Sequence, residues 1–273
     1  MDLTPKELYS SGKPIVIKGL LPSQKQVNAA MEYLCENGLI RINTTTDFMQ
    51  CFEDFVVVGD SVSCGYTNTQ DGSTIIDSAT AKERGINWPS FLSKDISRNF
   101  NNLAIGGTTA ADWRGSHVAT ASDVDADCYI VMLGINDMVH SRAVGTSGDI
   151  SENVADNNST FYGDLDYVVR TLLSYNPNAK VFLLTIPLEI ANKTSYNEAI
   201  RYIGTHTENV HLIDLDTKYK DDFATGGFMR NNQLGVHLTT LGYRKLATMI
   251  RDSINEYMES NFNQFYFIPY VSD

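Results

Sequence analysis

The chain has 273 residues, of which 42% are hydrophobic and 20% charged, and acidic residues outnumber basic ones by 33 to 21. This composition excludes disordered, collagen-like and coiled-coil chains, and it is typical of a globular protein with one sizeable core and an appendage. The net charge of −12 comes without any basic run, which argues against nucleic acid as a partner because reading a phosphate backbone requires positive charge.

The apolar runs of the chain are short. The longest, at residues 129–133 and 181–186, have the length of buried strands and not the roughly 20 residues that span a bilayer. We therefore expect no membrane segment and no membrane partner. The first ten residues are acidic and lack an apolar stretch, so no secretory signal is expected, and the sequence leaves the localisation open.

The first 52 residues predict a small appendage. A β-branched run at 14–18 precedes a helix that Ser23 opens, with Gln26 at the spacing of a capping box. Apolar side chains then recur on one helical face until Asn37-Gly38, and a second strand is expected at 39–42. This strand-helix-strand unit serves either attachment and oligomerisation or packing against the main domain.

Strands alternate with helices over residues 53–260. Continuous apolar runs at 55–58, 129–133, 181–186 and 210–213 are typical of parallel strands buried on both faces. Helical spacing of apolar residues predicts helices around 165–173 and 246–258. The chain is therefore expected to be an α/β protein, with an open parallel sheet between two helical layers and ligands at the carboxyl ends of the strands.

The last 13 residues, 261–273, are rich in aromatic side chains. Such a tail either packs on its own domain or docks on a neighbouring subunit. An oligomer could thus form through the N-terminal unit or through this tail.

Polar residues follow several of these predicted strands. Ser61 comes directly after the run at 55–58, a glycine pair follows an apolar stretch at 102–105, and Asn136 follows the run at 129–133. His237 precedes the last predicted helix. Because parallel strands end at one edge of a sheet, these groups are expected to converge there.

Four segments in this order resemble the SGNH or GDSL hydrolase family: VVVGDS at 56–61, NLAIGGTTAADW at 102–113, VMLGIND at 131–137 and GVHLTTLGY at 235–243. The resemblance covers about residues 53–258 and implies a flavodoxin-like, three-layer αβα fold. It also implies that Ser61 is the nucleophile and His237 its base, since a serine hydroxyl is inert without one. The oxyanion hole would consist of the N–H groups of Ser61 and Gly107 and the amide of Asn136, with Gly106 as the fallback for Gly107.

One position departs from the family. The usual aspartate three residues before the histidine is replaced by Leu234, which can neither fix the imidazole tautomer nor stabilise the imidazolium. Three alternatives follow. In the first, a backbone carbonyl of the 231–234 loop, with Asn232 as the candidate, orients His237. In the second, a carboxylate, Asp222 or its neighbour Asp221, replaces the aspartate. In the third, the site is catalytically weak and persists as a binding surface.

The predicted function is a serine esterase that cleaves a small acyl group, acetyl first, from a carbohydrate or other small ester. Acyl transfer to another alcohol uses the same residues. The rival hypothesis is a weak or inactive module that binds glycans or is a structural component of a surface or virion.

No cofactor is expected. Neither the four cysteines nor the remaining histidines show the spacing of metal ligands, so no metal site is expected either. Asp60 and Asp137 are expected to order their turns through hydrogen bonds to the backbone. Trp88 and Trp113 are expected in the core, with sugar stacking as the alternative.

Overall fold

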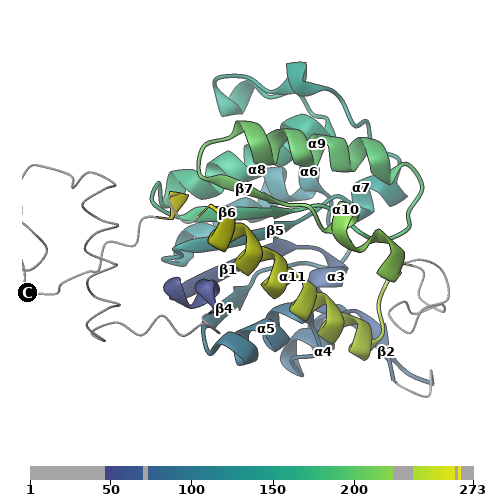
Figure 1. Ribbon diagram of the computed structural model, residues 1–273. Helices are drawn as coiled ribbons and strands as arrows, with labels where there is room; N and C mark the ends of the chain where they lie inside the picture. The colour runs from purple at the N-terminus through teal and green to yellow at the C-terminus, as the bar shows by residue number, and fades with distance from the viewer. Residues whose placement is uncertain (1–46, 70–72, 224–235, 262–263, 266–273) are drawn as a thin grey trace, which may run out of the picture. The chain divides into compact units, whose positions relative to one another are not determined.

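The computed structural model describes residues 47–69, 73–223, 236–261 and 264–265 (Figure 1). The chain divides into one compact unit of Met49–Tyr257 and a second of Met1–Phe48 with Met258–Asp273. The strand-helix-strand appendage predicted at 1–52 and most of the aromatic tail lie outside the described residues. The limits 1–52, 53–260 and 261–273 therefore stay predictions.

A five-stranded parallel sheet forms the centre of the larger unit, with the strand order β4-β1-β5-β6-β7. The strands are β1 (Asp54–Gly59), β4 (Asn99–Asn102), β5 (Cys128–Met132), β6 (Lys180–Leu184) and β7 (Val210–Ile213). β1 lies between its two neighbours, so that Val56 is opposite Asn101 on one side and Tyr129 on the other. The predicted open parallel sheet is confirmed.

Helices cover both faces of this sheet. In Figure 1, α6 (Ala110–Asp112), α8 (Phe161–Tyr175) and α9 (Lys193–His206) lie on one side, and α5 (Trp88–Ile96) and α11 (Thr240–Ser260) on the other. All five residues of β5 are buried, as are the four of the run at 55–58. Burial on both faces explains why these strands read as continuous apolar runs, and the three-layer αβα architecture is confirmed.

The predicted helix around 165–173 is α8. Thr160 caps its first turn by accepting from the N–H of Gly163, and the apolar positions Leu165, Val168, Val169 and Leu172 are fully buried. A face of three to four apolar residues per two turns is what packs such a helix on a sheet.

One strand of the sheet was not predicted. β4 has the sequence NFNN and lies at the edge, directly before the apolar stretch expected at 102–105. The ring of Phe100 stacks on Phe55 with centroids 4.4 Å apart, and the side-chain amide of Asn99 donates to Asp54. An edge strand with only one strand neighbour can carry polar residues, so hydrophobic pattern alone missed it.

The shorter elements connect these layers. They are α3 (Ser61–Cys64), α4 (Ser78–Glu83), α7 (Ile135–Val139), α10 (Leu215–Tyr219) and the antiparallel pair β2 (Thr67–Asn68) and β3 (Ile75–Ile76). The single turns are the 3₁₀ segments η1 (Phe48–Cys51), η3 (Val118–Asp123), η4 (Ser147–Asp149), η5 (Val154–Asp156) and η6 (Lys220–Phe223), and the π-type η2 (Trp113–His117). None of the helices in the described part is long and apolar enough to cross a membrane.

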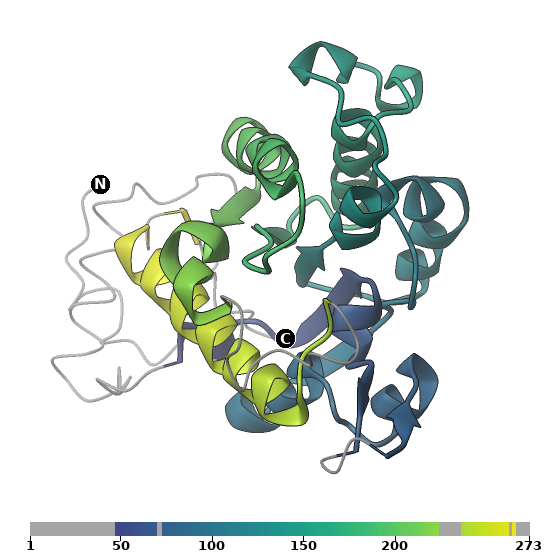
Figure 2. The ribbon, with the colours of Figure 1, turned by 90° about the vertical axis from the view of Figure 1, so that its right-hand side faces the viewer.

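The strand order places a switch point beside β1. From β1 the chain crosses to β4 on one side, and it then returns to β5 on the other side. In open α/β sheets, ligands bind at the carboxyl ends of strands at such a point. Figure 2 shows the larger unit from the side on which α3, α7 and α10 lie in Figure 1.

Candidate active site

Ser61 stands at the carboxyl end of β1 as the first residue of α3. The strand leaves the sheet through Gly59, where a Cβ atom would lie 2.4 Å from the hydroxyl oxygen of Ser63, so only glycine fits this turn. The carboxylate of Asp60 caps α3 by accepting from the N–H of Val62 at 2.9 Å. The predicted turn-ordering function of Asp60 is thus confirmed, and Ser61 retains 8% exposure.

His237 lies against Ser61 although 176 residues separate them in the chain. Its Nε2 atom is 2.8 Å from the Ser61 Oγ atom. This is the distance at which an imidazole can accept the hydroxyl proton of a serine. The two residues that the sequence predicted as nucleophile and base are therefore in direct hydrogen-bond contact.

The remaining predicted groups border this pair. Gly106 lies against Ser61, since a Cβ atom on Gly106 would be 3.9 Å from Cβ of Ser61. Gly107 follows with a φ of +82°, is exposed, and would have open space around a Cβ atom. Which of the two glycines donates to an oxyanion stays a prediction.

Asn136 is the second residue of α7, which follows β5, and its side-chain amide donates to the carbonyl oxygen of Thr108 at 3.0 Å. This bond fixes one N–H of the amide and thereby the direction of the other. It also joins the Asn136 turn to the loop that carries Gly106 and Gly107. Two of the loops expected at this edge are thus linked directly.

Both tryptophans lie in the core. Trp113 is fully buried, and its indole N–H lies within hydrogen-bond distance of the carbonyl oxygen of Gly59 and of the Thr108 hydroxyl. Trp88 is equally buried and donates to the hydroxyl of Ser63. The predicted core position is confirmed, and the alternative of sugar stacking is wrong for both because neither ring is accessible.

Asp137 links the Asn136 turn to α6. Its Oδ2 atom accepts from the N–H of Ala110 at 3.0 Å, which confirms the expected backbone hydrogen bond. Its Oδ1 atom lies 3.4 Å from the guanidinium of Arg142, which also pairs with Asp164. Burial raises the pKa of Asp137 to about 6, although the Ala110 N–H and Arg142 act in the opposite direction. This charge network was not predicted from the sequence.

Asp60 is fully buried, and no hydrogen-bond donor of the described residues reaches its Oδ2 atom. Burial raises the pKa of Asp60 from 3.8 to about 7. A carboxyl group whose pKa is higher in the folded state costs stability as the pH rises from the unfolded pKa to the folded one.

We therefore expect Asp60→Asn to become progressively more stable than the wild type between pH 4 and 8, with the gap levelling off at roughly 4 kcal/mol near pH 8. Asparagine keeps the N-cap but cannot ionise. Urea unfolding between pH 4 and 8 measures the gap. Asp77→Asn is the matched control, since Asp77 caps α4 from an exposed position where hydrogen bonds lower its pKa, and this substitution should lose stability as the pH rises. A gap for Asp60→Asn that does not vary with pH would contradict the expectation.

The candidates for orienting His237 are only partly described. Asn232 and Leu234 lie outside the described residues, and Asp222 is an exposed residue of η6, next to Asp221. Each of the three alternatives for this position therefore stays a prediction.

The other histidines differ in their burial. His211 is buried beside Tyr257, and burial lowers its pKa to about 4, whereas His140 and His206 are exposed. Within the described ranges, no group of three histidine, cysteine, aspartate or glutamate side chains could hold a metal ion.

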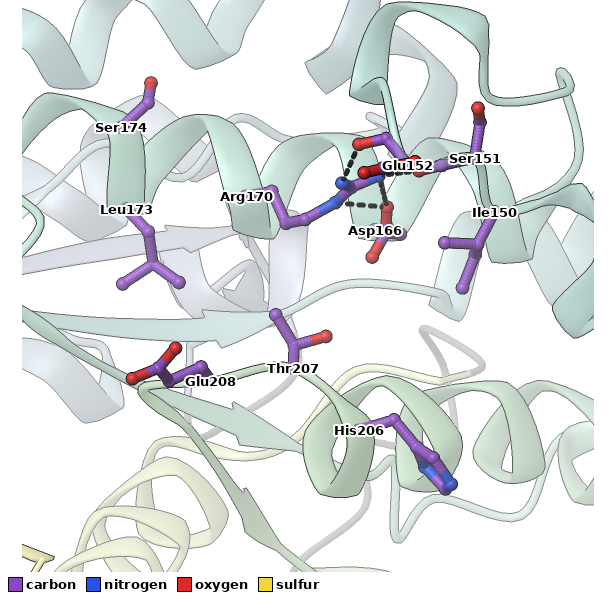
Figure 3. A pocket seen from close by; sticks show the side chains of 10 residues that line it. All are labelled: Ile150, Ser151, Glu152, Asp166, Arg170, Leu173, Ser174, His206, Thr207 and Glu208. Carbon is purple, nitrogen blue, oxygen red and sulfur yellow. Dashed lines mark hydrogen bonds and ion pairs between the residues drawn. The ribbon is translucent and has the colours of Figure 1, made fainter.

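A cavity of about 590 Å³ lies away from this site, between the C-terminal half of α8 and the end of α9 (Figure 3). The Arg170 guanidinium on its wall donates to Asp166 and to the carbonyl oxygens of Ser151 and Glu152. These bonds anchor the 150–152 segment to α8, which gives Arg170 a structural role at the wall of the cavity.

The parallel sheet between two helical layers and the Ser61–His237 contact at its carboxyl edge are those expected of a serine hydrolase of the SGNH type. The model of the GDSL-like lipase/acylhydrolase family matches residues 57–245, and the chain belongs to this family of ester-hydrolysing enzymes.

Solved structures share the fold. The structure of a protein from Bacteroides ovatus that is assigned as a GDSL-like lipase superimposes with a TM-score of 0.54 at 16% identity. The match covers 77% of this chain and 99% of that one. A family two carbohydrate esterase from Cellvibrio japonicus gives a TM-score of 0.53 at 16% identity, over 76% and 62%. A possible lipase from Chitinophaga pinensis gives 0.52 at 18% identity, over 74% and 98%. No curated protein sequence matches the chain.

Proposed function

We propose that the protein is a serine esterase that removes a small acyl group, acetyl first, from a carbohydrate ester. The observation that carries this proposal is the 2.8 Å contact between His237 Nε2 and Ser61 Oγ. The carbohydrate part has weaker support: the fold is shared with the Cellvibrio japonicus carbohydrate esterase, and a net charge of −12 favours a neutral ester over an anionic one.

The reaction follows from the positions of these groups. Ser61 Oγ attacks the ester carbonyl carbon while His237 Nε2 takes the hydroxyl proton, and the carbonyl oxygen becomes an oxyanion. When the intermediate collapses, the bond to the alcohol oxygen breaks and His237 returns the proton to that alcohol. Water then attacks the acyl-serine with His237 again as base, which releases the acid and restores Ser61.

We infer that three donors would hold the oxyanion. The Asn136 amide is fixed by its bond to Thr108, and the N–H groups of Ser61 and of Gly107 or Gly106 come from turns that the sheet edge holds. Preorganised donors of this kind typically contribute a factor of about 10²–10³ each. His237 would be oriented either by a carbonyl of the 231–234 loop or by Asp222.

A fluorophosphonate probe tests the proposal, because only an activated serine reacts with it. We expect one label by intact mass on the wild type, none on Ser61→Ala, and one on Ser63→Ala, whose serine lies in the same helix but binds Trp88. A wild type that takes no label, or a Ser61→Ala variant that is labelled equally, contradicts the proposal and favours the binding module.

Once Ser61 is shown to be labelled, a second experiment separates hydrolysis from acyl transfer. It analyses the products formed from an acetylated sugar with and without an added sugar acceptor.

A further inference from the structure

The ring of Tyr66 lies against the imidazole of His237. The two ring centroids are 4.6 Å apart and the planes are tilted by 48°. Both residues are half-buried. His237, the proposed base, therefore has an aromatic ring beside it as well as the Ser61 hydroxyl.

The backbone around Tyr66 is tied to the serine turn. Its N–H donates to the carbonyl oxygen of Ser61 at 3.1 Å. The chain reaches this position through Gly65, whose φ is +89° and where a Cβ atom would lie 1.9 Å from the Ile86 carbonyl oxygen, so no other residue fits. The position of the Tyr66 ring is thus set by the same turn that presents the nucleophile.

The same segment is tied to the histidine side of the site. The buried hydroxyl of Tyr243 in α11 donates to the carbonyl oxygen of Tyr66 at 2.8 Å. The Thr67 hydroxyl donates to the carbonyl oxygen of Leu238, the residue after His237, also at 2.8 Å. Residues 66–67 therefore bridge the chain segments that carry Ser61 and His237.

We propose that Tyr66 is a positioning residue, which holds the His237 imidazole toward Ser61 and stabilises its protonated form through the face of its ring. This inference rests on the proposed function of His237 as the base. After His237 takes the serine proton it is a cation, and a cation within about 6 Å of an aromatic centroid is attracted by the negative ring face. The family's usual aspartate stabilises the imidazolium, and this chain has Leu234 at that position.

Two titratable groups, Asp60 and Tyr243, lie close to this contact in the chain or in space. Asp60 precedes Ser61 in the chain, and burial raises its pKa to about 7, so it is mostly neutral in more acidic solution. Tyr243 faces the Tyr66 backbone from α11, and burial raises its pKa far above the ordinary value. The variants Tyr66→Phe and Tyr66→Leu leave both of these groups in place, so a difference between the two variants in the titration of His237 reports the ring.

The test is an NMR titration of the imidazole signals in the wild type, Tyr66→Phe and Tyr66→Leu, with the His237 signal assigned from His237→Gln. We expect the pKa of His237 to fall by about half a unit in Tyr66→Leu and to stay within about 0.1 unit in Tyr66→Phe, which keeps the ring face. The other four histidines are internal controls. On an acetyl ester, Tyr66→Leu should lower kcat about tenfold with little change in KM, and Tyr66→Phe should retain it.

An unchanged His237 pKa in Tyr66→Leu, or an equal shift in Tyr66→Phe, overturns the proposal. If Tyr66→Leu does not fold, by its melting temperature and signal dispersion, Tyr66→Met provides the same comparison. The titration needs no substrate, so it decides the matter even if Ser61 proves unreactive toward fluorophosphonate, a result that counts only against the proposed esterase function.

Discussion

Replacing Ser61 by alanine, or His237 by glutamine, is expected to lower kcat/KM for an acetyl ester by about 10⁴-fold or more, and the double replacement should lower it no further. The two side chains act as one unit because Nε2 lies 2.8 Å from Oγ. Without His237 the hydroxyl keeps its proton, and without Ser61 the imidazole has nothing to activate. The measurement is initial-rate kinetics of the wild type, both single variants and the double variant.

The matched control for losing an imidazole is His206→Gln. His206 is exposed at the end of α9, where its ring stacks on Tyr202, and its loss should leave kcat/KM within about twofold. Single losses that multiply in the double variant would show that the two residues act separately. An unaffected His237→Gln variant would show that another group is the base.

The sheet could be predicted where the strands are buried on both faces. The runs at 55–58, 129–133 and 181–186 correspond to the three inner strands, where burial of both faces leaves little room for polar residues, and the run at 210–213 is the edge strand β7, which includes His211. The apolar pattern did not predict β4. Its asparagines are satisfied by partners such as the Asp54 side chain and the Ser63 carbonyl, which only the folded sheet brings near.

The site was predictable to the extent that short motifs follow strands. Ser61 and Asn136 come directly after β1 and β5, so the rule that parallel strands share a carboxyl edge was enough to bring them together. His237 needed the family resemblance, because its segment follows no strand that the sequence predicts.

Tyr66 could not have been found in this way. Its importance depends on the contact with His237 and on bonds such as Thr67 to Leu238, which join residues 171 positions apart. In the sequence Tyr66 is only an aromatic residue after a turn glycine. Likewise, nothing local distinguishes Asp164 from a first-turn acidic residue at the surface.

Asp164→Asn is expected to lower the free energy of unfolding by about 3 kcal/mol, since it removes the shared partner of two guanidinium groups. The carboxylate is fully buried and pairs with Arg114 at 3.0 Å and with Arg142 at 3.1 Å. Burial raises the pKa of Asp164, whereas both guanidinium groups act in the opposite direction. The amide of asparagine keeps the shape but turns one acceptor oxygen into an NH2 donor, which then faces a partly buried guanidinium group.

Urea unfolding at pH 7 measures this loss, with Glu256→Gln as the control. Glu256 pairs with Lys218 on the surface, where both side chains are exposed, so its replacement should cost less than about 1 kcal/mol. A loss for Asp164→Asn no larger than for the control would show that the cluster is stabilised by its backbone contacts alone.

Arg142 also pairs with Asp137, whose carboxylate accepts a hydrogen bond from the N–H of Ala110, near the loop that carries Gly106 and Gly107. Freeing Arg142 from Asp164 should therefore loosen the Asn136 turn before the core unfolds, and hydrogen exchange at Ala110 should rise more in Asp164→Asn than in Glu256→Gln.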